Sequence, residues 1–178
     1  YAWRAGDLIE RIETVGDDGS GSVRTLAKTS YTYDEKYRMT SENVQSFLAN
    51  PAASTDLKTL YFYDKRDRLE KIVDSRGGIT AFQYDGLNRL TAQIDPMGNE
   101  TRYTYDANSN PVRIESHDQE PDGTVSILAK TYTYDARNRQ ISRLEPDGSG
   151  VVLDYDARDL IVRQTDYFGR IKTIAYGA

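Results

Sequence analysis

Residues 90–94 and 103–105 alternate apolar and polar side chains with a period of two. In the first stretch, leucine, alanine and isoleucine are separated by threonine and glutamine, and in the second stretch two tyrosines flank a threonine. This period is typical of a β-strand that buries one of its faces. Each stretch is therefore predicted to form a strand.

The two predicted strands are separated by Asp-Pro-Met-Gly at residues 95–98. In such a turn the aspartate accepts backbone N–H groups, the proline presets φ at the second position, and the glycine takes the left-handed conformation. Similar sequences with a glycine in fourth place occupy residues 120–123 and 145–148. We therefore expect hairpin turns at these places, with Gly98 and Gly148 at positive φ.

The tyrosine-containing strand recurs along the whole chain and is followed each time by an aspartate. The second aromatic residue and the aspartate of the six clear copies are Tyr33 and Asp34, Tyr63 and Asp64, Tyr84 and Asp85, Tyr105 and Asp106, Tyr134 and Asp135, and Tyr155 and Asp156. Degenerate copies contain Trp3 and Tyr176, and successive copies are 21, 29 or 30 residues apart. Repeats of this length stack on their neighbours to bury an apolar face. Residues 1–178 are predicted to form one continuous array of about seven units, open at both ends and cut from a longer protein.

A second kind of turn follows each aspartate. Its third residue after the aspartate is polar in all but one copy: Tyr37, Asp67, Asn88, Ser109, Asn138 and Asp159. Asn and Asp tolerate the left-handed region and can close a hairpin where glycine is otherwise used. Two alternating turns per unit predict an all-β fold, an antiparallel meander of β-hairpins.

The 29-residue step from Tyr105 to Tyr134 adds eight residues to the basic unit, with residues 120–123 near their middle. We expect four extra residues on each strand of one hairpin, which should project beyond its neighbours. Comparable extensions should have their tips at residues 16–21 and 49–54. The nearest candidate for a helix is residues 42–49, and its signal is weak.

Composition narrows the possible functions. Twelve of the 14 tyrosines fall in the repeat, which makes tyrosine mainly architectural. A net charge of −5 argues against a nucleic-acid partner, and no apolar run approaches the roughly 18 residues of a membrane span. With no cysteine and one histidine, thiol catalysis, a structural zinc site and a Ser-His-Asp triad are excluded or nearly so. We assign no catalytic residue, metal or cofactor, and expect no enzyme activity.

The remaining polar residues each have a structural explanation that we prefer. The six aspartates of the repeat should cap their own turns and not form a row of catalytic or metal-binding carboxylates. The arginines that follow (Arg38, Arg68, Arg89 and Arg139) should pair with that aspartate or stack on a tyrosine of an adjacent unit. Residues 17–21 and 106–110 resemble calcium loops but lack the remote bidentate glutamate. His117 is expected to be a solvated edge residue.

The sequence of residues 95–106, followed by Asn-Arg-Leu in the best copies, resembles the YD repeat of Rhs proteins, toxin-complex C components and teneurins. The resemblance covers essentially the whole chain. It departs from the family at the second turn, where the usual glycine is replaced, and Tyr37 is the position at which positive φ is most disfavoured. The resemblance implies a long β-sheet that spirals into a hollow shell, whose lumen holds a toxic C-terminal domain in the bacterial relatives.

The regular tyrosines leave a second interpretation open. A stripe of aromatic rings can stack on sugars, and carbohydrate binding has been proposed for such repeats, although alternate tyrosines more often form a cross-strand ladder. The candidate binding residues are Tyr33, Tyr63, Tyr84, Tyr105, Tyr134 and Tyr155.

We interpret the chain as a structural segment of an Rhs-type shell that encapsulates or presents a C-terminal toxin or effector in a large secreted or surface-exposed bacterial protein. The alternative is an extracellular adhesion module that binds carbohydrate or protein. The expected partners of the chain are the rest of its own repeat shell and an enclosed effector, with glycans as a further candidate. The open strand edges near residues 1–12 and 170–178 also predict self-association.

Overall fold

The structure is a computed structural model that describes residues 2–3, 8–17, 21, 23–47 and 55–177. These residues form fifteen β-strands and no helix. The chain divides into two compact units, Tyr1–Phe82 and Gln83–Ala178. The predicted all-β class is confirmed. That the chain is one continuous array stays a prediction.

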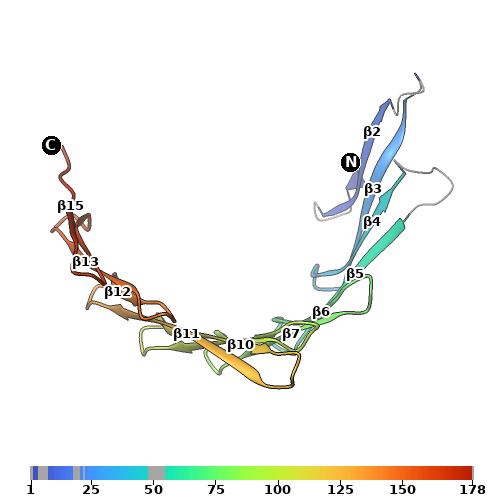
Figure 1. Cartoon of the computed structure of the whole chain (residues 1–178). Coiled ribbons are helices and arrows are strands. Elements are labelled where there is room, and N and C mark those ends of the chain that lie inside the picture. Colours follow the sequence, from blue (N-terminus) through green and yellow to red (C-terminus); the bar gives the residue numbers. More distant parts are fainter. Residues whose placement is uncertain (1, 4–7, 18–20, 22, 48–54, 178) are drawn as a thin grey trace. The chain divides into compact units, whose positions relative to one another are not determined.

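The first unit is an antiparallel meander in which each strand pairs with the next one along the chain (Figure 1). Its strands are β1 (Ala2–Trp3), β2 (Ile9–Asp17), β3 (Val23–Tyr33), β4 (Met39–Ser46), β5 (Thr55–Tyr63), β6 (Leu69–Val73) and β7 (Ile79–Tyr84), the last of which runs past the boundary between the units.

The second unit repeats this topology, again with antiparallel pairing of consecutive strands. Its strands are β8 (Leu90–Ile94), β9 (Glu100–Tyr105), β10 (Pro111–Gln119), β11 (Val125–Tyr134), β12 (Gln140–Leu144), β13 (Gly150–Tyr155), β14 (Ile161–Asp166) and β15 (Ile171–Thr173).

Two alternating turns connect the strands, as the sequence predicts. At the first kind of turn, the N–H of Gly98 donates to the carbonyl of Asp95 at 3.0 Å, and the N–H of Asp95 donates to Asn99 at 2.9 Å. Gly98 and Gly148 have φ values of 87° and 81°. This conformation costs a residue with a Cβ about 1–2 kcal/mol, which explains the glycine in fourth place.

The second kind of turn uses the same hydrogen bonds without glycine. Six residues with a side chain adopt φ between 61° and 69° in these turns: Tyr37, Asp67, Asn88, Ser109, Asn138 and Asp159. The turn also forms at Tyr37, where the sequence put it in doubt, with a φ of 63°. The N–H of Tyr37 donates to the carbonyl of Asp34 at 3.0 Å, so the hydrogen bonds of the turn outweigh the local strain.

The structure has a strand, and no helix, in the described part of residues 42–49, the nearest helix candidate in the sequence. Residues 42–46 lie in β4, which pairs with β3 and β5 on its two sides. Residues 48 and 49 lie outside the described residues. Pairing with two neighbouring strands satisfies backbone groups that a short helix would leave partly exposed.

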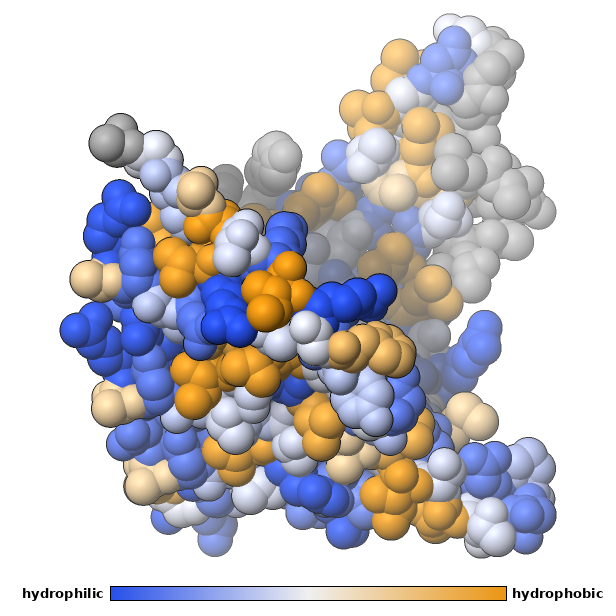
Figure 2. Space-filling view, turned by 60° about the vertical axis from the view of Figure 1, so that its left-hand side comes forward, coloured by the Kyte–Doolittle hydropathy of each residue, from blue (hydrophilic) through white to orange (hydrophobic). Residues whose placement is uncertain are grey.

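The sheet of each unit has two faces and very little core. We call the face that carries Tyr31, Tyr61, Tyr103 and Tyr132 the tyrosine face, and the opposite side the threonine face. Among the described residues only Ala92 and Ser41 are buried. Figure 2 shows hydrophobic residues interspersed with hydrophilic ones on the surface in view.

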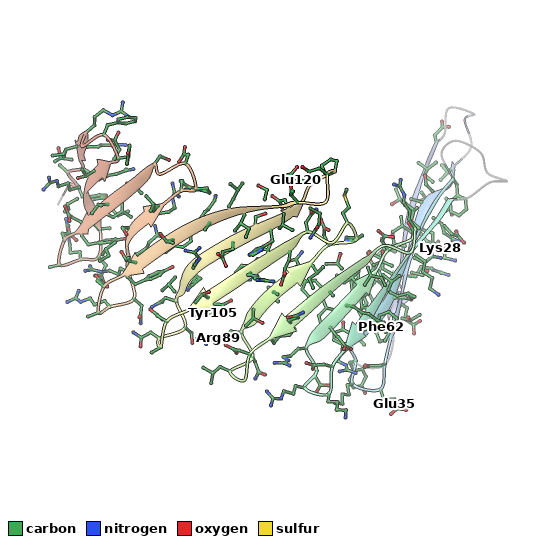
Figure 3. All side chains as sticks on the ribbon, turned by 60° about the horizontal axis from the view of Figure 1, so that its bottom comes forward. Lys28, Glu35, Phe62, Arg89, Tyr105 and Glu120 are labelled. Atoms are coloured by element: carbon green, nitrogen blue, oxygen red, sulfur yellow. The ribbon has the colours of Figure 1, made fainter. Side chains whose placement is uncertain are left out.

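The long repeat step produces a long hairpin, as predicted. β10 and β11 pair from Arg113 with Thr131 as far as Gln119 with Val125, and β11 extends six residues beyond the last residue of β12. Figure 3 shows this hairpin, with Glu120 at its tip. Most of the other two predicted tips, residues 18–20 and 49–54, lies outside the described residues. The described residues contain no helix that could cross a membrane.

Candidate functional site: the turn latch

The feature that recurs through both units is a set of contacts around the aspartate that follows each tyrosine strand. In the second unit, Oδ1 of Asp85 accepts the N–H groups of Leu87 at 2.8 Å and of Arg89 at 3.0 Å. Its Oδ2 accepts Nε–H of Arg89 at 2.7 Å. One carboxylate thus closes the turn and orients the arginine, and these backbone and side-chain hydrogen bonds hold the pKa of Asp85 below its usual value.

The oriented arginine reaches the next tyrosine strand. The guanidinium carbon of Arg89 lies 4.7 Å from the ring centroid of Tyr105 (Figure 3). Its Nη1 donates to the carbonyl of Asp106 at 3.1 Å and to Oγ of Ser109 at 3.2 Å. A cation over an aromatic face is attracted by the ring quadrupole. The arginine therefore joins two successive turns, and we call this arrangement of aspartate, arginine and tyrosine the turn latch.

The tyrosine hydroxyl completes the latch. Tyr105 donates its hydroxyl proton to the carbonyl of Leu90, the residue after the arginine, at 2.8 Å. Burial raises the pKa of Tyr105. The hydroxyl therefore stays a hydrogen-bond donor to the backbone over the physiological pH range.

Two other latches have the same geometry. Arg38 pairs with Asp34, stacks at 4.6 Å on Tyr63 and reaches Asp67 with Nη1 at 2.5 Å. Arg139 pairs with Asp135, stacks at 4.5 Å on Tyr155 and reaches Asp159 with Nη1 at 2.6 Å. The hydroxyls of Tyr63 and Tyr155 donate to the residues after these arginines, Met39 and Gln140.

Arg68 also pairs with its aspartate, Asp64, through Nε at 2.7 Å. Two further copies lack the arginine. Asn110 replaces the arginine after Asp106 and bonds its carboxylate at 2.9 Å. After Asp156 the position is Leu160, which contributes only its backbone N–H, at 3.0 Å. The hydroxyls of Tyr33, Tyr134 and Tyr176 still reach backbone carbonyls, those of Ile9, Pro111 and Ile161, and Tyr84 ends β7.

The structure therefore places the predicted site residues in two roles. The aspartates accept hydrogen bonds within their own turns. Arg38, Arg89 and Arg139 do both things that the sequence left open, pairing with the aspartate and stacking on a tyrosine. The tyrosine hydroxyl bonds are the part that sequence reasoning missed. No local pattern indicates them, because donor and acceptor are 15 to 24 residues apart.

The second missed feature is a carboxylate on the tyrosine face of the first unit. Glu42 lies directly opposite Tyr31 in the pairing of β3 and β4. Burial, and then the Glu42 carboxylate, raise the pKa values of Tyr31 and Tyr61. No apolar alternation marks residues 40–46, which are polar except for Val44, so this register has no local signal in the sequence.

His117 is not a solvated edge residue. It lies in β10, which is paired on both sides, and its side chain is 13% exposed. Its Nε2 is buried without a hydrogen-bond partner among the described residues, and Oε2 of Glu115 lies 3.7 Å away. Pairing with β9 and β11 covers a position that the long hairpin led us to expect in solvent.

The described residues hold no group of three His, Cys, Asp or Glu side chains that could bind a metal ion. In the loop at residues 106–110, the Asp106 carboxylate accepts the N–H groups of Asn108 and Asn110. In the loop at 17–21, Asp17 accepts the N–H of Gly21 at 2.9 Å, while residues 18–20 lie outside the described part. In both loops that resemble calcium loops, the first carboxylate, Asp17 or Asp106, thus accepts backbone N–H groups of its own loop.

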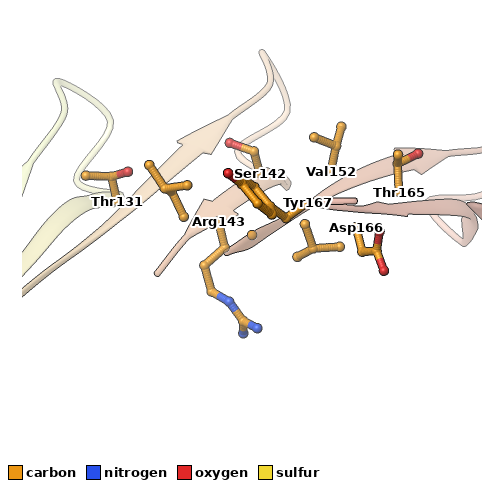
Figure 4. Close-up of a pocket in the computed structure, with 10 residues that line it drawn as sticks. Thr131, Ser142, Arg143, Val152, Thr165, Asp166 and Tyr167 are labelled. Atoms are coloured by element: carbon orange, nitrogen blue, oxygen red, sulfur yellow. The ribbon is translucent and has the colours of Figure 1, made fainter. Parts of the chain in front are cut away.

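One surface depression of about 350 Å³ lies over β12–β14 (Figure 4). Ser142, Val152 and Thr165 line it together with Tyr167. Its single carboxylate, Asp166, accepts the N–H groups of the following turn. The depression therefore offers a small, mostly neutral surface and no arrangement of catalytic groups.

Comparisons with known proteins agree with this picture. Residues 63–96 and 84–125 match the family described as RHS Repeat. No curated protein sequence matches the chain. In the structure of a Tc holotoxin pore from Photorhabdus luminescens, one chain matches with a TM-score of 0.64 and 14% identity, over 88% of this chain and 9% of that one.

A second solved structure, the complex TcdB2-TccC3, matches with a TM-score of 0.45 and 12% identity, over 86% of this chain and 11% of that one. The protein spans about a tenth of the length of these solved chains. At this identity the likeness to the holotoxin chain shows the fold.

Proposed function

We propose that this chain, which contains RHS repeats at residues 63–125, forms part of the wall of a shell that encapsulates or presents a C-terminal toxin or effector. The fold that it shares with the holotoxin chain supports the proposal. The parent would be a large bacterial protein, secreted or exposed at the cell surface. The rest of the repeat shell and the enclosed effector are the partners.

The observation that carries this proposal is the turn latch. Each complete latch ties a turn to the next tyrosine strand, so the recurring side chains of the repeat hold neighbouring hairpins together. Arg89, for example, contacts Asp85, Tyr105 and Ser109 at once. Side chains engaged in this way support a wall and leave no group free for catalysis at the latch. We therefore propose a structural role without enzyme activity.

The alternative of a glycan-binding module is less well supported by the same geometry. Tyr63, Tyr105 and Tyr155 each have a guanidinium over one ring face and a hydroxyl bonded to the backbone. A sugar that stacks on these rings would compete with arginine for that face. Binding of the isolated chain to a glycan array, lost in Tyr105→Ala, would favour the alternative.

The proposal is tested in the complete reading frame that contains this segment. Protease is added to the purified full-length protein and the fate of the segment downstream of the repeats is followed. We expect protection in the wild type and cleavage in the double variant Arg89→Ala, Arg139→Ala, which opens two latches. Arg137→Ala, an exposed arginine outside the tyrosine stack, is the control and should leave the protection intact. Equal cleavage in the wild type and the double variant would contradict encapsulation.

A further inference from the structure

Strand β11 has one open edge. It pairs with β10 along residues 125–131, but on its other side β12 reaches only as far as Thr131, which lies opposite Leu144. Within the described part of the chain, no strand pairs with residues 125–130 on that side. These residues belong to the long hairpin whose tip is labelled at Glu120 in Figure 3.

The turn after β11 shows which backbone groups face the open edge. The N–H of Asp135 donates to Arg139, and its carbonyl accepts the N–H of Asn138, so both groups of Asp135 point toward β12. Backbone groups alternate sides along a strand, and the extra residue of the bulge near Tyr134 lies on β12. Alternation therefore directs the backbone groups of Val125, Ile127 and Ala129 to the open edge.

The first unit shows what covers the equivalent edge. Leu26 and Ile127 each lie eight residues before the aspartate of their repeat. The carbonyl of Leu26 accepts the N–H of Phe47 at 2.9 Å, and the next residues of β3, Ala27 and Lys28, pair with β4. In the first unit, β4 and Phe47 thus pair with the part of β3 that is equivalent to the open edge of β11 in the second unit.

The side chains of the open edge do not protect it. Val125, Ile127 and Leu128 are 45%, 56% and 49% exposed. The only charged residue is Lys130, and its Nζ lies 3.2 Å from Oε2 of Glu145. Natural edge strands are usually shielded by charges, proline or bulges. This strand has none of these between residues 125 and 129.

We propose that this edge pairs with the same edge of a second copy of the chain, antiparallel, about a two-fold axis that passes through Ile127. In this register Ile127 faces Ile127 of the partner subunit, and Val125 faces Ala129 of the partner subunit. All three residues have their backbone groups on the edge, so each pair exchanges both hydrogen bonds. The two copies bury the same surface on each other, as a closed two-fold interface requires.

The length of the edge selects this register. An axis through Leu128 would bring Val125 of the partner subunit opposite Thr131, which already pairs with Leu144. An axis through Ile127 places Thr124 of the partner subunit opposite Lys130, where the edge is still free. No like charges then lie opposite each other. Because each copy carries a net charge of −5, added salt should strengthen the pairing.

The test is sedimentation equilibrium of the chain over a series of protein concentrations. We expect a dimer in the wild type. Ile127→Pro removes the N–H group at the centre of the interface while leaving the bonds between β10 and β11, and Ile127→Lys places two ammonium groups opposite each other. Each change should weaken the dimer by about tenfold or more.

Ile171→Lys is the matched control, because Ile171 is 55% exposed and lies in the last strand. It should leave the dimerisation constant unchanged. Circular dichroism checks that each variant keeps its β-structure. If Ile127→Pro does not fold, Ile127→Lys alone tests whether the edge of β11 forms the dimer. A wild type that stays monomeric at high micromolar concentration overturns the proposal. So does a dimer that both Ile127 variants leave intact, or one that Ile171→Lys dissociates instead.

Discussion

The guanidinium of Arg89 lies over the ring of Tyr105, with its central carbon 4.7 Å from the ring centroid. The two residues belong to successive repeat units, and each makes a further bond that fixes its position. Arg89 is held by the Asp85 carboxylate, and Tyr105 by the carbonyl of Leu90. The stack therefore joins two hairpins through groups that are already oriented, which reduces the entropy lost in forming it.

The hydroxyl of Tyr105 should contribute measurably to stability. Tyr105→Phe removes the donor to Leu90 and should lower the free energy of unfolding by about 1 kcal/mol. Tyr167→Phe is the control, because Tyr167 is exposed and has no hydrogen bond from its hydroxyl among the described residues. Urea unfolding followed by circular dichroism measures both. Equal losses in the two variants would contradict the role of this hydroxyl in the latch.

Two arginines that contact the same carboxylate should differ in importance. Arg139 and Arg137 both reach Oδ1 of Asp159, but Arg139 is 24% exposed and also binds Asp135 and Tyr155, whereas Arg137 is 63% exposed. Arg139→Ala should lower the thermal midpoint several times more than Arg137→Ala, since exposed ion pairs contribute little. Arg139→Lys should recover only part of the loss, because lysine lacks the planar fork. A larger effect at Arg137 would show that the stack is unimportant.

Tyr37 occupies a left-handed position that glycine adopts without strain. Its φ is 63° and its side chain is largely exposed. Tyr37→Gly should therefore stabilise the first unit by up to about 1 kcal/mol. Leu87→Gly, an exposed residue of the equivalent turn that is not at positive φ, should destabilise by about 0.5–1 kcal/mol. Thermal unfolding compares the two, and a loss of stability in both variants would refute the strain at Tyr37.

Gly148 should be difficult to replace because of its backbone and not because of its surroundings. A Cβ added there meets no atom within 4 Å, but φ is 81°. Gly148→Ala should therefore cost about 1 kcal/mol. A Cβ at Gly86 also meets nothing, and its φ is not positive, so Gly86→Ala should be neutral or slightly stabilising. The same effect at both glycines, measured by urea unfolding, would argue against backbone strain.

Acid should destabilise the turns. The pKa values of Asp34 and Asp135 are lowered by hydrogen bonds from their arginines, from an ordinary value of 3.8. A lowered folded-state pKa contributes stability that is present above pH 3.8 and is lost as the pH falls through the folded pKa. The thermal midpoint should therefore fall as the pH drops below about 4. Asp135→Asn should flatten this pH dependence, and Asp154→Asn, an exposed aspartate outside the turns, should not.

The repeat motif made most of the fold predictable. Alternation in residues such as 90–94 indicates strands, and glycine at Gly98 indicates a turn, because both depend on interactions between residues close in sequence. The pairing of each aspartate with the arginine four residues later is local in the same way. The sequence was less informative at Tyr37 and at residues 42–46. At Tyr37, hydrogen bonds within the turn outweigh the strain of positive φ, and residues 42–46 are extended because they pair with β3 and β5.

By itself, the sequence determined the all-β class, the order of the hairpins and the two kinds of turn, because these follow from periodicity and from φ preferences within a few residues. Only the tertiary structure decided which tyrosine receives each arginine, that the tyrosine hydroxyls reach backbone carbonyls of another strand, that His117 is covered, and that residues 125–130 keep an open edge. These features depend on strand register and on where a neighbouring strand ends. Register joins residues 15 or more positions apart, and local side-chain preferences do not specify it.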